Sequence, residues 1–231
     1  PINSVNECLK FLKISIKDVD AIGAATLPDR LIKRYLKYTL DNFPKSNSLF
    51  LSERAFNRMK FLNNIENYIR EKLNFKKKIF FYNHHLCHIA SSHFLSGFKE
   101  SCSVSIDGLG EIESASIGIG KGKKVKMIDS ITYPDSLGIV YKGITDYLGF
   151  DHRTSQGTVM ALAAFGDYKK KLKNKKGTYY SEFKKIIKIL NNGKFEINKT
   201  YFNYPYKLEG WVSNKFLEIF GKRRKKNTRV L

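Results

Sequence analysis

Residues 101–134 read SCSVSIDGLGEIESASIGIGKGKKVKMIDSITYP, and this stretch decides the fold. At its start Cys102, Val104 and Ile106 alternate with small polar residues, which is the period-two pattern of a β-strand. A DGLG turn and a glycine-rich GKGKK turn separate two further strand-like runs. The stretch therefore predicts three consecutive antiparallel strands.

The sequence on both sides of this meander predicts helices and short strands. Directly downstream, Ser136 caps a helix predicted over residues 137–148. The other predicted elements are a first helix opened by a capping box of Ser4 and Glu7, helices over 31–42, 53–74, 86–95, 158–165 and 180–190, a buried strand over 18–28, a strand over 77–83, and a hairpin over 193–202. This order predicts a mixed α/β (α+β) fold in which a three-stranded meander is followed by helices.

The composition is that of a folded globular protein, because 42% of the 231 residues are hydrophobic and 13% are aromatic. The longest apolar run, at 159–165, is far shorter than the roughly 20 residues of a membrane-spanning helix, so we expect no membrane partner. The cysteines Cys8, Cys87 and Cys102 have no CxxC spacing. That pattern argues against a disulfide framework or a thiolate zinc site and fits a cytoplasmic location.

The charge is strongly positive, since 42 Lys and Arg against 21 Asp and Glu give +21. Such a balance occurs in proteins that bind nucleic acid or anionic lipid. Here the lysines are spread along the whole chain, which favours a solvated surface over a nucleic-acid partner. We interpret the densest basic runs, at 168–180 and 221–231, as a mobile loop and a tail. Because the chain begins at Pro1 without an initiator Met, we expect a fragment.

Four of the five histidines lie in one window, YNHHLCHIASSHF at residues 82–94. On a helix, His84 and His88 project from one face and are close enough to share an ion, whereas His85 is rotated roughly 100° away. A metal ion of this kind takes three or four protein ligands. Asp107 is the natural third ligand, because it ends the first strand of the meander on its polar face. An HxxxH pair also arises by chance or in a packed core, and both alternatives stay open.

The remaining histidines and the nearby cysteine have structural interpretations. His93 and His152 are predicted to be structural or surface residues. Cys87 lies between the paired histidines in sequence, but its side chain would face away from them. We therefore predict that Cys87 is a core residue.

Two glycine loops are candidates for binding an anion. In DGLGE, Gly108 and Gly110 allow backbone amides to approach a phosphate or a metal-bound water. In SQGTVMALAAFGD, Gly157 and Thr158 open a helix whose N-terminal amides could face an anion. An ordinary hairpin and an ordinary helix entry are equally compatible with these loops.

The blocks NHHLCHIASSHFLSGF, VSIDGLGE, YPDSLGIVYKGITDYLGF and GTVMALAAFGD together resemble the NodU/CmcH-type carbamoyltransferase family. The likeness, in block order and in spacing, runs from about residue 21 to residue 224. It implies that residues 1–220 are part of the N-terminal domain of such a protein, with 221–231 as a basic tail at a truncated end. That domain has the actin/hexokinase/Hsp70-like (ribonuclease H-like) ATPase fold.

The resemblance implies an O-carbamoyltransferase. Members of the family use carbamoyl phosphate and ATP to make a carbamoyl-adenylate, and then pass the carbamoyl group to a hydroxyl of a small molecule or glycan. In the family the HxxxH pair and the following Asp hold a metal ion, which assigns His84, His88 and Asp107 to a divalent cation, either iron or zinc. The glycine-loop residues, namely Gly108, Gly110, Gly157 and Thr158, become candidate nucleotide- or carbamoyl-binding residues. No catalytic residue is assigned.

This chain departs from the family in two respects. Thr158 stands where members commonly carry a lysine, which predicts weaker nucleotide binding or a charge placed elsewhere. The family's opening glycine-rich strand, its second lobe and its adenylating domain are absent, so we expect no carbamoyl transfer by these 231 residues alone. The alternatives are a relative that modifies tRNA with threonylcarbamoyl and a non-enzymatic module that binds anions or nucleic acid.

Overall fold

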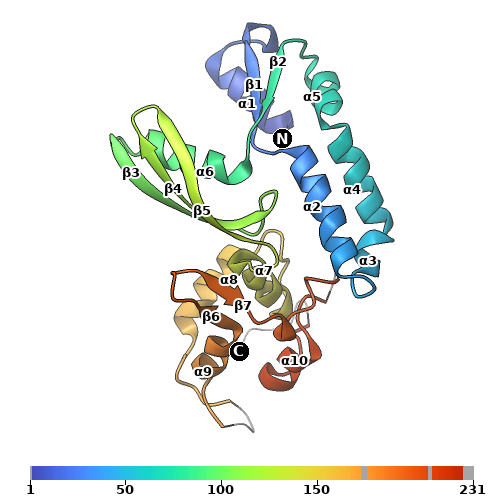
Figure 1. The fold of residues 1–231 in the computed structure, drawn as a ribbon, viewed down its shortest axis with the longest axis vertical. Coiled ribbons are helices and arrows are strands. Elements are labelled where there is room, and N and C mark those ends of the chain that lie inside the picture. Colours follow the sequence, from blue (N-terminus) through green and yellow to red (C-terminus); the bar gives the residue numbers. More distant parts are fainter. Residues whose placement is uncertain (1, 173–175, 208–209, 226–231) are drawn as a thin grey trace.

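The computed structural model describes residues 2–172, 176–207 and 210–225. Its elements fall into three groups along the chain (Figure 1). The first group contains α1 (Ile2–Leu12), β1 (Ala21–Ala24), α2 (Pro28–Asp41), α3 (Asn47–Phe50), α4 (Glu53–Asn63), α5 (Ile65–Leu73) and β2 (Lys78–Phe81). The second contains α6 (His84–Leu95), β3 (Glu100–Ile106), β4 (Glu113–Lys121) and β5 (Lys124–Thr132). The third contains α7 (Leu137–Tyr147), α8 (Gln156–Leu162), α9 (Tyr179–Ile186), β6 (Ile187–Ile189), β7 (Phe195–Ile197) and α10 (Asn214–Phe220). The predicted mixed α/β class is confirmed.

The predicted meander is confirmed as well, because β3, β4 and β5 form one antiparallel sheet in that order. Ile106 at the end of β3 lies opposite Ala115 near the start of β4. The pairing continues one step into the connecting loop, where the Asp107 amide donates to the Ser114 carbonyl at 2.9 Å. The loop after β3 is therefore fixed to the sheet, and this loop carries the predicted carboxylate ligand.

Helix α6 covers one face of the meander at very short range. A Cβ added to Gly118 would lie 2.5 Å from Cδ1 of Ile89, and one added to Gly120 would lie 2.2 Å from Cγ of His93. No side chain larger than hydrogen fits at these two positions of β4, and glycine permits the close approach of the helix. The alternating glycines in ESASIGIGK thus determine where α6 lies.

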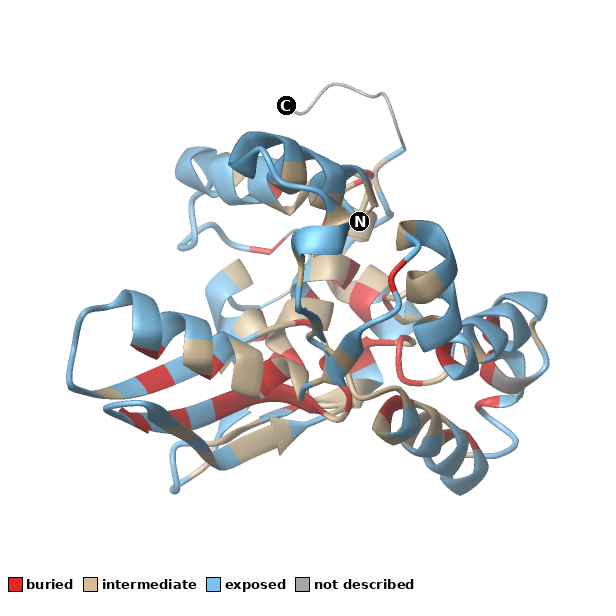
Figure 2. Cartoon of the chain, turned by 90° about the horizontal axis from the view of Figure 1, so that it is seen from above, coloured by how far each residue is buried: buried red, intermediate tan, exposed pale blue. Residues whose placement is uncertain are grey.

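The polar and apolar faces of β3 are arranged in an unexpected way. The alternation predicted from the sequence is present, but the small polar residues form the covered side, where Ser103 is buried. Val104 and Ile106 on the opposite side are 64% and 59% exposed. Along the second half of β4, buried residues alternate with exposed ones, and Figure 2 shows such red and pale-blue segments in the sheet. The helix packs on serine and glycine rather than on the branched aliphatic residues.

Near the N-terminus, β1 and β2 form a short parallel pair in which Ala21 lies opposite Lys78. The prediction of a buried strand over 18–28 is wrong, because β1 has only four residues and two of them are exposed. Pro28 does not end the strand but occupies the first turn of α2, where its missing N–H costs nothing. The predicted capping box is also wrong, since α1 begins at Ile2 and Ser4 lies inside the helix.

Several predicted helices have different bounds in the structure, and three of them differ most. The helix predicted over 53–74 is divided into α4 and α5 at Asn64, whose φ of −111° and ψ of 12° are not helical. The helix predicted over 158–165 starts earlier as α8 and ends in a 3₁₀ turn, Ala163–Phe165. The helix predicted over 180–190 ends at Ile186, and the chain continues directly into β6. Because β6 pairs with β7, the hairpin lies earlier than the predicted 193–202.

The third group has its own hydrophobic core, and α7 is its central helix. Ser136 caps α7 as predicted, since its side chain accepts a hydrogen bond from the Ile139 amide. The buried core residues are Val140, Ile186, Ile197, Tyr201, Phe202, Tyr204, Val212 and Phe216. This core fixes the orientation of α7, whose first turn packs against the loop after β3.

The first part of the basic segment 221–231 is bound to the end of α7. Arg223 donates to the Asp146 carboxylate at 2.6 Å, and the Arg224 amide donates to the Tyr147 carbonyl at 3.0 Å. The rest of that segment, 226–231, lies outside the described residues, as does 173–175 of the basic run at 168–180. Across the described residues, no helix combines the length and the apolar character that a bilayer crossing requires.

Candidate metal centre

The paired histidines lie in the first two turns of α6. Asn83, directly after β2, is the N-cap of this helix, and its side chain accepts a hydrogen bond from the Leu86 amide at 2.8 Å. The helix therefore starts at His84, two residues before the predicted start. Because His84 and His88 are both helical, the i, i+4 spacing brings their rings together, with centroids 4.6 Å apart.

The three predicted metal ligands converge on one point. Nε2 of His84 lies 2.9 Å from Oδ2 of Asp107 and 3.1 Å from Nε2 of His88. Nε2 of His88 lies 3.8 Å from the same carboxylate oxygen. All three atoms are within 4.8 Å of one another. Two side chains come from α6 and the third from the loop after β3, so the packing of α6 on the sheet assembles the cluster.

The hydrogen bonds around the cluster determine the tautomer of His84 and the ionisation state of Asp107. Nδ1 of His84 lies 3.2 Å from the Ala25 carbonyl, which can only accept, so Nδ1 carries the hydrogen. When the ring is protonated, Nε2 donates to Oδ2 of Asp107, and when the ring is neutral, Nε2 presents a lone pair that a metal ion can take. Oδ1 of Asp107 accepts from the Gly108 amide at 2.6 Å. Burial alone would raise the pKa of Asp107, but this amide and His84 outweigh it, so the pKa lies below its ordinary value and the group is a carboxylate at neutral pH.

Glu111, which the sequence interpretation missed, joins the three segments that meet at the cluster. It is 1% exposed. Its Oε1 accepts from the Leu27 amide at 3.0 Å, and its Oε2 accepts from the His84 amide at 3.1 Å and from Asn83 Nδ2 at 3.0 Å. The carboxylate thus holds the start of α6 and the segment before α2 against the DGLGE loop. A glutamate directly after the glycine turn was the only signal in the sequence.

A second buried glutamate, also missed, stands beside the first. Oε1 of Glu113 accepts from Arg30 at 3.0 Å, and its Oε2 lies 3.4 Å from Asn83 Nδ2. Burial would raise the pKa of Glu113, but hydrogen bonds and the charge of Arg30 outweigh it, so the pKa lies below its ordinary value. The charge of Arg30 compensates one of the two buried carboxylates.

Three small residues allow the segments to approach closely. A Cβ added to Gly110 would lie 2.8 Å from the His85 ring and 3.3 Å from Cβ of His84. A Cβ added to Gly138, in the first turn of α7, would lie 2.6 Å from the Asp107 backbone. Ser136 donates its hydroxyl to the Gly108 carbonyl at 2.6 Å. The loop that carries Asp107 is therefore held between α6 and the N-terminus of α7.

The histidines outside the cluster have structural roles, as predicted for His93 and His152. His93 is buried, and its ring nitrogens lie 2.8 Å from Ser101 Oγ and 2.9 Å from the Gly122 carbonyl. His152 lies 3.7 Å from the Asp146 carboxylate and packs on Trp211. His85 is also buried and bonds Ser116, and burial lowers the pKa of its imidazole.

The predicted core position of Cys87 is wrong, because this residue is only half-buried. Burial raises the pKa of its thiol, and the Glu111 carboxylate adds to that. The thiol is therefore protonated at neutral pH and makes a poor nucleophile. Because the clustered ligand atoms belong to His84, His88 and Asp107, Cys87 is not part of the candidate metal centre.

The four predicted phosphate-loop residues do not come together. Gly108 and Gly110 lie beside the cluster, but their amides are already used, by Asp107 Oδ1 at 2.6 Å and by the Glu113 carbonyl at 2.8 Å. Gly157 and Thr158 are exposed in the first turn of α8, and a Cβ on Gly157 would have no atom within 4 Å. Of the two predicted loops, the one at the start of α8 has exposed backbone that a ligand could approach.

The residues of the cluster fit a divalent cation. Two imidazole nitrogens and one carboxylate oxygen form a mixed N/O donor set that suits zinc or ferrous iron. The Ala25 carbonyl bonded to His84 Nδ1 is the kind of outer partner that orients a metal-binding histidine. With three lone pairs directed at one point, a cation is the simplest species that satisfies them together.

The chain belongs to the carbamoyltransferase family. Residues 7–230 match the family described as carbamoyltransferase N-terminus, which confirms the resemblance found in the sequence blocks.

Curated relatives include the Synechocystis protein sll1178, to which the chain is 29% identical over 97% of its own length and 36% of that protein. It is 26% identical to the nodulation protein NolNO of Sinorhizobium fredii, over 85% of the chain and 27% of the relative. The nodulation protein NolO of Bradyrhizobium diazoefficiens is 30% identical over 50% of the chain and 20% of the relative. The chain thus spans about a third or less of the length of these relatives.

Proposed function

We propose that the chain forms part of the N-terminal domain of an O-carbamoyltransferase that holds a divalent cation at His84, His88 and Asp107. In this proposal the carbamoyl group comes from carbamoyl phosphate through an ATP-dependent carbamoyl-adenylate. It passes to a hydroxyl of a small molecule or glycan. Family membership supports carbamoyl transfer in general. The observation that carries the metal assignment is the convergence of the three ligand atoms within 4.8 Å.

The transfer step defines what the domain must do. The acceptor hydroxyl oxygen forms a bond to the carbamoyl carbon, the bond from that carbon to the adenylate phosphate oxygen breaks, and the hydroxyl proton is released. A divalent cation supplies Lewis-acid polarisation of a carbonyl when it is bound. The residues around it supply orientation, because Glu111 fixes the start of α6 and Ser136 fixes the loop that carries Asp107. Such fixed positions favour transfer, because the reacting groups must be held close together and in the right orientation.

Nucleotide contact is proposed at the first turn of α8. Gly157 lacks a side chain and the backbone there is exposed, so a phosphate can approach it. Thr158 offers a hydroxyl in place of the lysine common in the family. We expect weaker nucleotide affinity than a lysine would give, because an ion pair with phosphate is replaced by a neutral hydrogen bond.

The test compares metal content and activity in the full chain that carries this domain. Wild-type protein and the double variant His84→Ala/His88→Ala are loaded with Fe²⁺ or Zn²⁺, desalted and measured by mass spectrometry. His152→Ala is the matched control for metal content alone, because it removes a histidine that is outside the cluster but lines the cavity between the first and third groups. We expect about one ion per chain in wild type and control, and an at least hundredfold weaker affinity in the double variant. Retention of the metal by the double variant would refute the assignment.

Carbamoyl transfer is tested with the same wild-type protein. The assay is pyrophosphate exchange into ATP that depends on carbamoyl phosphate, measured without any acceptor. The proposed donor chemistry requires exchange above background. A protein that binds metal but shows no exchange would contradict the carbamoyl-adenylate route.

A further inference from the structure

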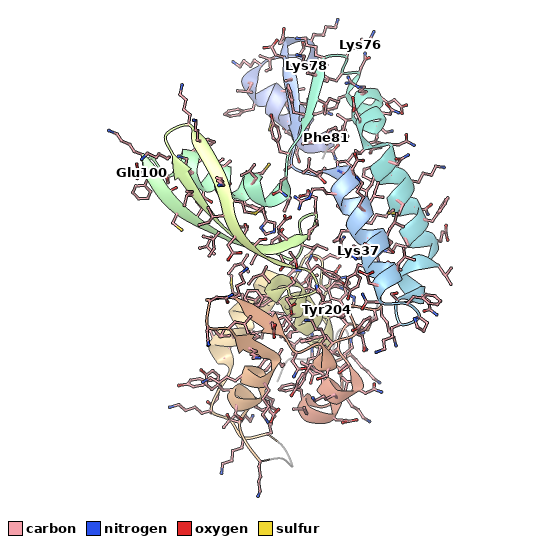
Figure 3. The ribbon with its side chains drawn as sticks, viewed as in Figure 1. Lys37, Lys76, Lys78, Phe81, Glu100 and Tyr204 are labelled. Carbon is pink, nitrogen blue, oxygen red and sulfur yellow. The ribbon has the colours of Figure 1, made fainter. Side chains whose placement is uncertain are left out.

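A cavity of about 310 Å³ lies next to the candidate metal centre, between the helices of the first group and the core of the third. Its lining includes Tyr38 from α2, Ala55 from α4, and Leu109 from the loop that carries Asp107. Tyr204, labelled in Figure 3, lines it from the third group. The size is near the lower end of small-molecule sites, which span about 300–1,000 Å³.

The cavity is lined by positive charge. Six of its lining residues are cationic: Arg34, Arg54, Arg58, Lys142, Arg153 and Lys207. None of the described residues that line it is acidic. This is unlike the rest of the surface, where lysines are spread out and several pair with carboxylates, as Lys37 does with Asp41 at 2.8 Å.

Most of these cations have no counter-ion among the residues that the structure describes. Among the described residues, no ion pair or hydrogen bond involves the charged groups of Arg34, Arg54, Arg58 or Lys142. Arg153 is different, because its Nε lies 3.3 Å from Asp151. Cations held close together without a partner repel one another, and an anionic ligand removes that cost.

Arg34 lies in an unfavourable environment for a charged side chain. Its Nε is buried with no hydrogen-bond partner in the described part of the chain, and its guanidinium lies 5.3 Å from the centre of the Tyr133 ring. The pKa of Arg34 lies below its ordinary value, chiefly because the group is withdrawn from water, and the charge of Arg58 adds to that. A buried guanidinium N–H without an acceptor in the protein is a donor that an oxygen of a ligand could satisfy.

Aromatic rings form the remaining wall of the cavity. The aromatic lining residues are Tyr35, Tyr38, Tyr133, Tyr204 and Trp211. Tyr38 and Tyr133 pack edge to face with centroids 4.8 Å apart. Rings of this kind provide flat apolar surfaces for a sugar or another planar group, while the cations supply polar contacts.

Lys142 connects the cavity to the reaction centre. A Cβ added to Gly108 would lie 3.4 Å from Lys142 Nζ, so this ammonium lies directly against the residue that follows Asp107. A ligand held by the arginines therefore extends toward the loop that carries Asp107. This is the arrangement that an acceptor needs, with its charged part anchored and a hydroxyl near the centre.

We propose that this cavity binds the acceptor, and that the acceptor is a sugar bearing a phosphate group. The assignment as acceptor rests on the proposed carbamoyltransferase function. The arginines take the phosphate, and the tyrosines take the sugar. The transfer step is as given above: a hydroxyl of this sugar forms the new bond to the carbamoyl carbon, adenylate leaves, and one proton is released.

The test is calorimetric titration of the full chain with glucose 6-phosphate, glucose and AMP as probes. The variant Arg54→Gln/Arg58→Gln removes two exposed cavity charges from α4. The matched control, Lys33→Gln/Lys60→Gln, removes the same charge from exposed positions of α2 and α4 outside the cavity lining. We expect glucose 6-phosphate to bind at least tenfold more tightly than glucose. Its affinity should fall at least tenfold in the arginine variant and less than twofold in the control.

Each other outcome overturns the inference. Equal binding of glucose, or unchanged affinity in the arginine variant, would show that the cations do not select a phosphate. Displacement of glucose 6-phosphate by AMP would show that the cavity belongs to the donor. The exchange assay, run without acceptor, separates the two proposals. Exchange without sugar phosphate binding overturns the acceptor assignment alone, whereas binding without exchange overturns the carbamoyltransferase proposal and the acceptor assignment with it.

Discussion

Substitution of Glu111 by Gln should destabilise the fold strongly although it changes one atom. The carboxylate has two oxygens, and both accept: Oε1 from the Leu27 amide, Oε2 from the His84 amide and Asn83. The Gln amide nitrogen can only donate, so in either orientation it faces at least one N–H group. At least one hydrogen bond to a charged group is lost and a buried donor is left without an acceptor. Together these effects cost about 2–4 kcal/mol.

The measurement is urea unfolding of wild type and variant at pH 7, with the variant Glu100→Gln as control. Glu100 is exposed and pairs with Lys121 across the sheet, so its neutralisation should change the free energy of unfolding little. In a thermal melt of a domain of this size, the Glu111 variant should also unfold about 5–15 °C lower. Because Glu111 also holds the start of α6, metal affinity at His84 and His88 should fall. Equal stability of the two variants would show that Glu111 does not join the three segments.

Two further predictions concern the same packing. The fold stabilises the ionised form of buried Glu113, whose pKa lies below the ordinary glutamate value of 4.5. The free energy of unfolding of wild type should therefore decrease as the pH falls from 4.5 through this lowered pKa. The variant Arg30→Met should lose less stability over that interval, and identical pH profiles in urea unfolding would contradict this. Gly120→Ala should cost about 1–3 kcal/mol, since its Cβ would overlap the His93 ring, which is fixed by hydrogen bonds at both nitrogens. Gly157→Ala is the control, with no atom within 4 Å, and similar unfolding midpoints for the two alanine variants would be the contrary result.

The sequence predicted the elements whose pattern is local. The meander follows from strict alternation and two glycine turns, and α7 follows from the Ser136 cap, so both are confirmed. The errors lie where a local pattern competes with a neighbour in space. Residues 187–189 continue the helical spacing of α9, yet they pair with β7 as a strand. The exposed position of Val104 could not be predicted either, because only the location of α6 decides which side of β3 is covered.

The candidate site shows the same division. The His84–His88 spacing and the position of Asp107 after a strand suggested a shared site, the family resemblance assigned the three residues to it, and their side chains lie together in the structure. The roles of Glu111 and Asn83 were not predictable, because their partners lie in segments that are distant in sequence, as Leu27 is from Glu111. The cationic cavity was not predictable either, because its lining residues come from segments that are distant in sequence. Arginines of α2 and α4 are unremarkable members of a lysine-rich, basic chain until folding places them around one volume without a carboxylate.

The glycines of β4 connect this packing to the chemistry. His84 and His88 can meet Asp107 only if α6 lies close to the end of β3, and Gly118 and Gly120 set that distance. The same helix start is held by Glu111, and the same loop is held by Ser136 at the N-terminus of α7. A cation at the triad would therefore join elements that are already positioned by hydrogen bonds and close packing. Because the fold already holds the three ligand atoms together, an ion would bind there without having to order them. The proposed metal ligands and the small residues beneath α6 therefore act as one site.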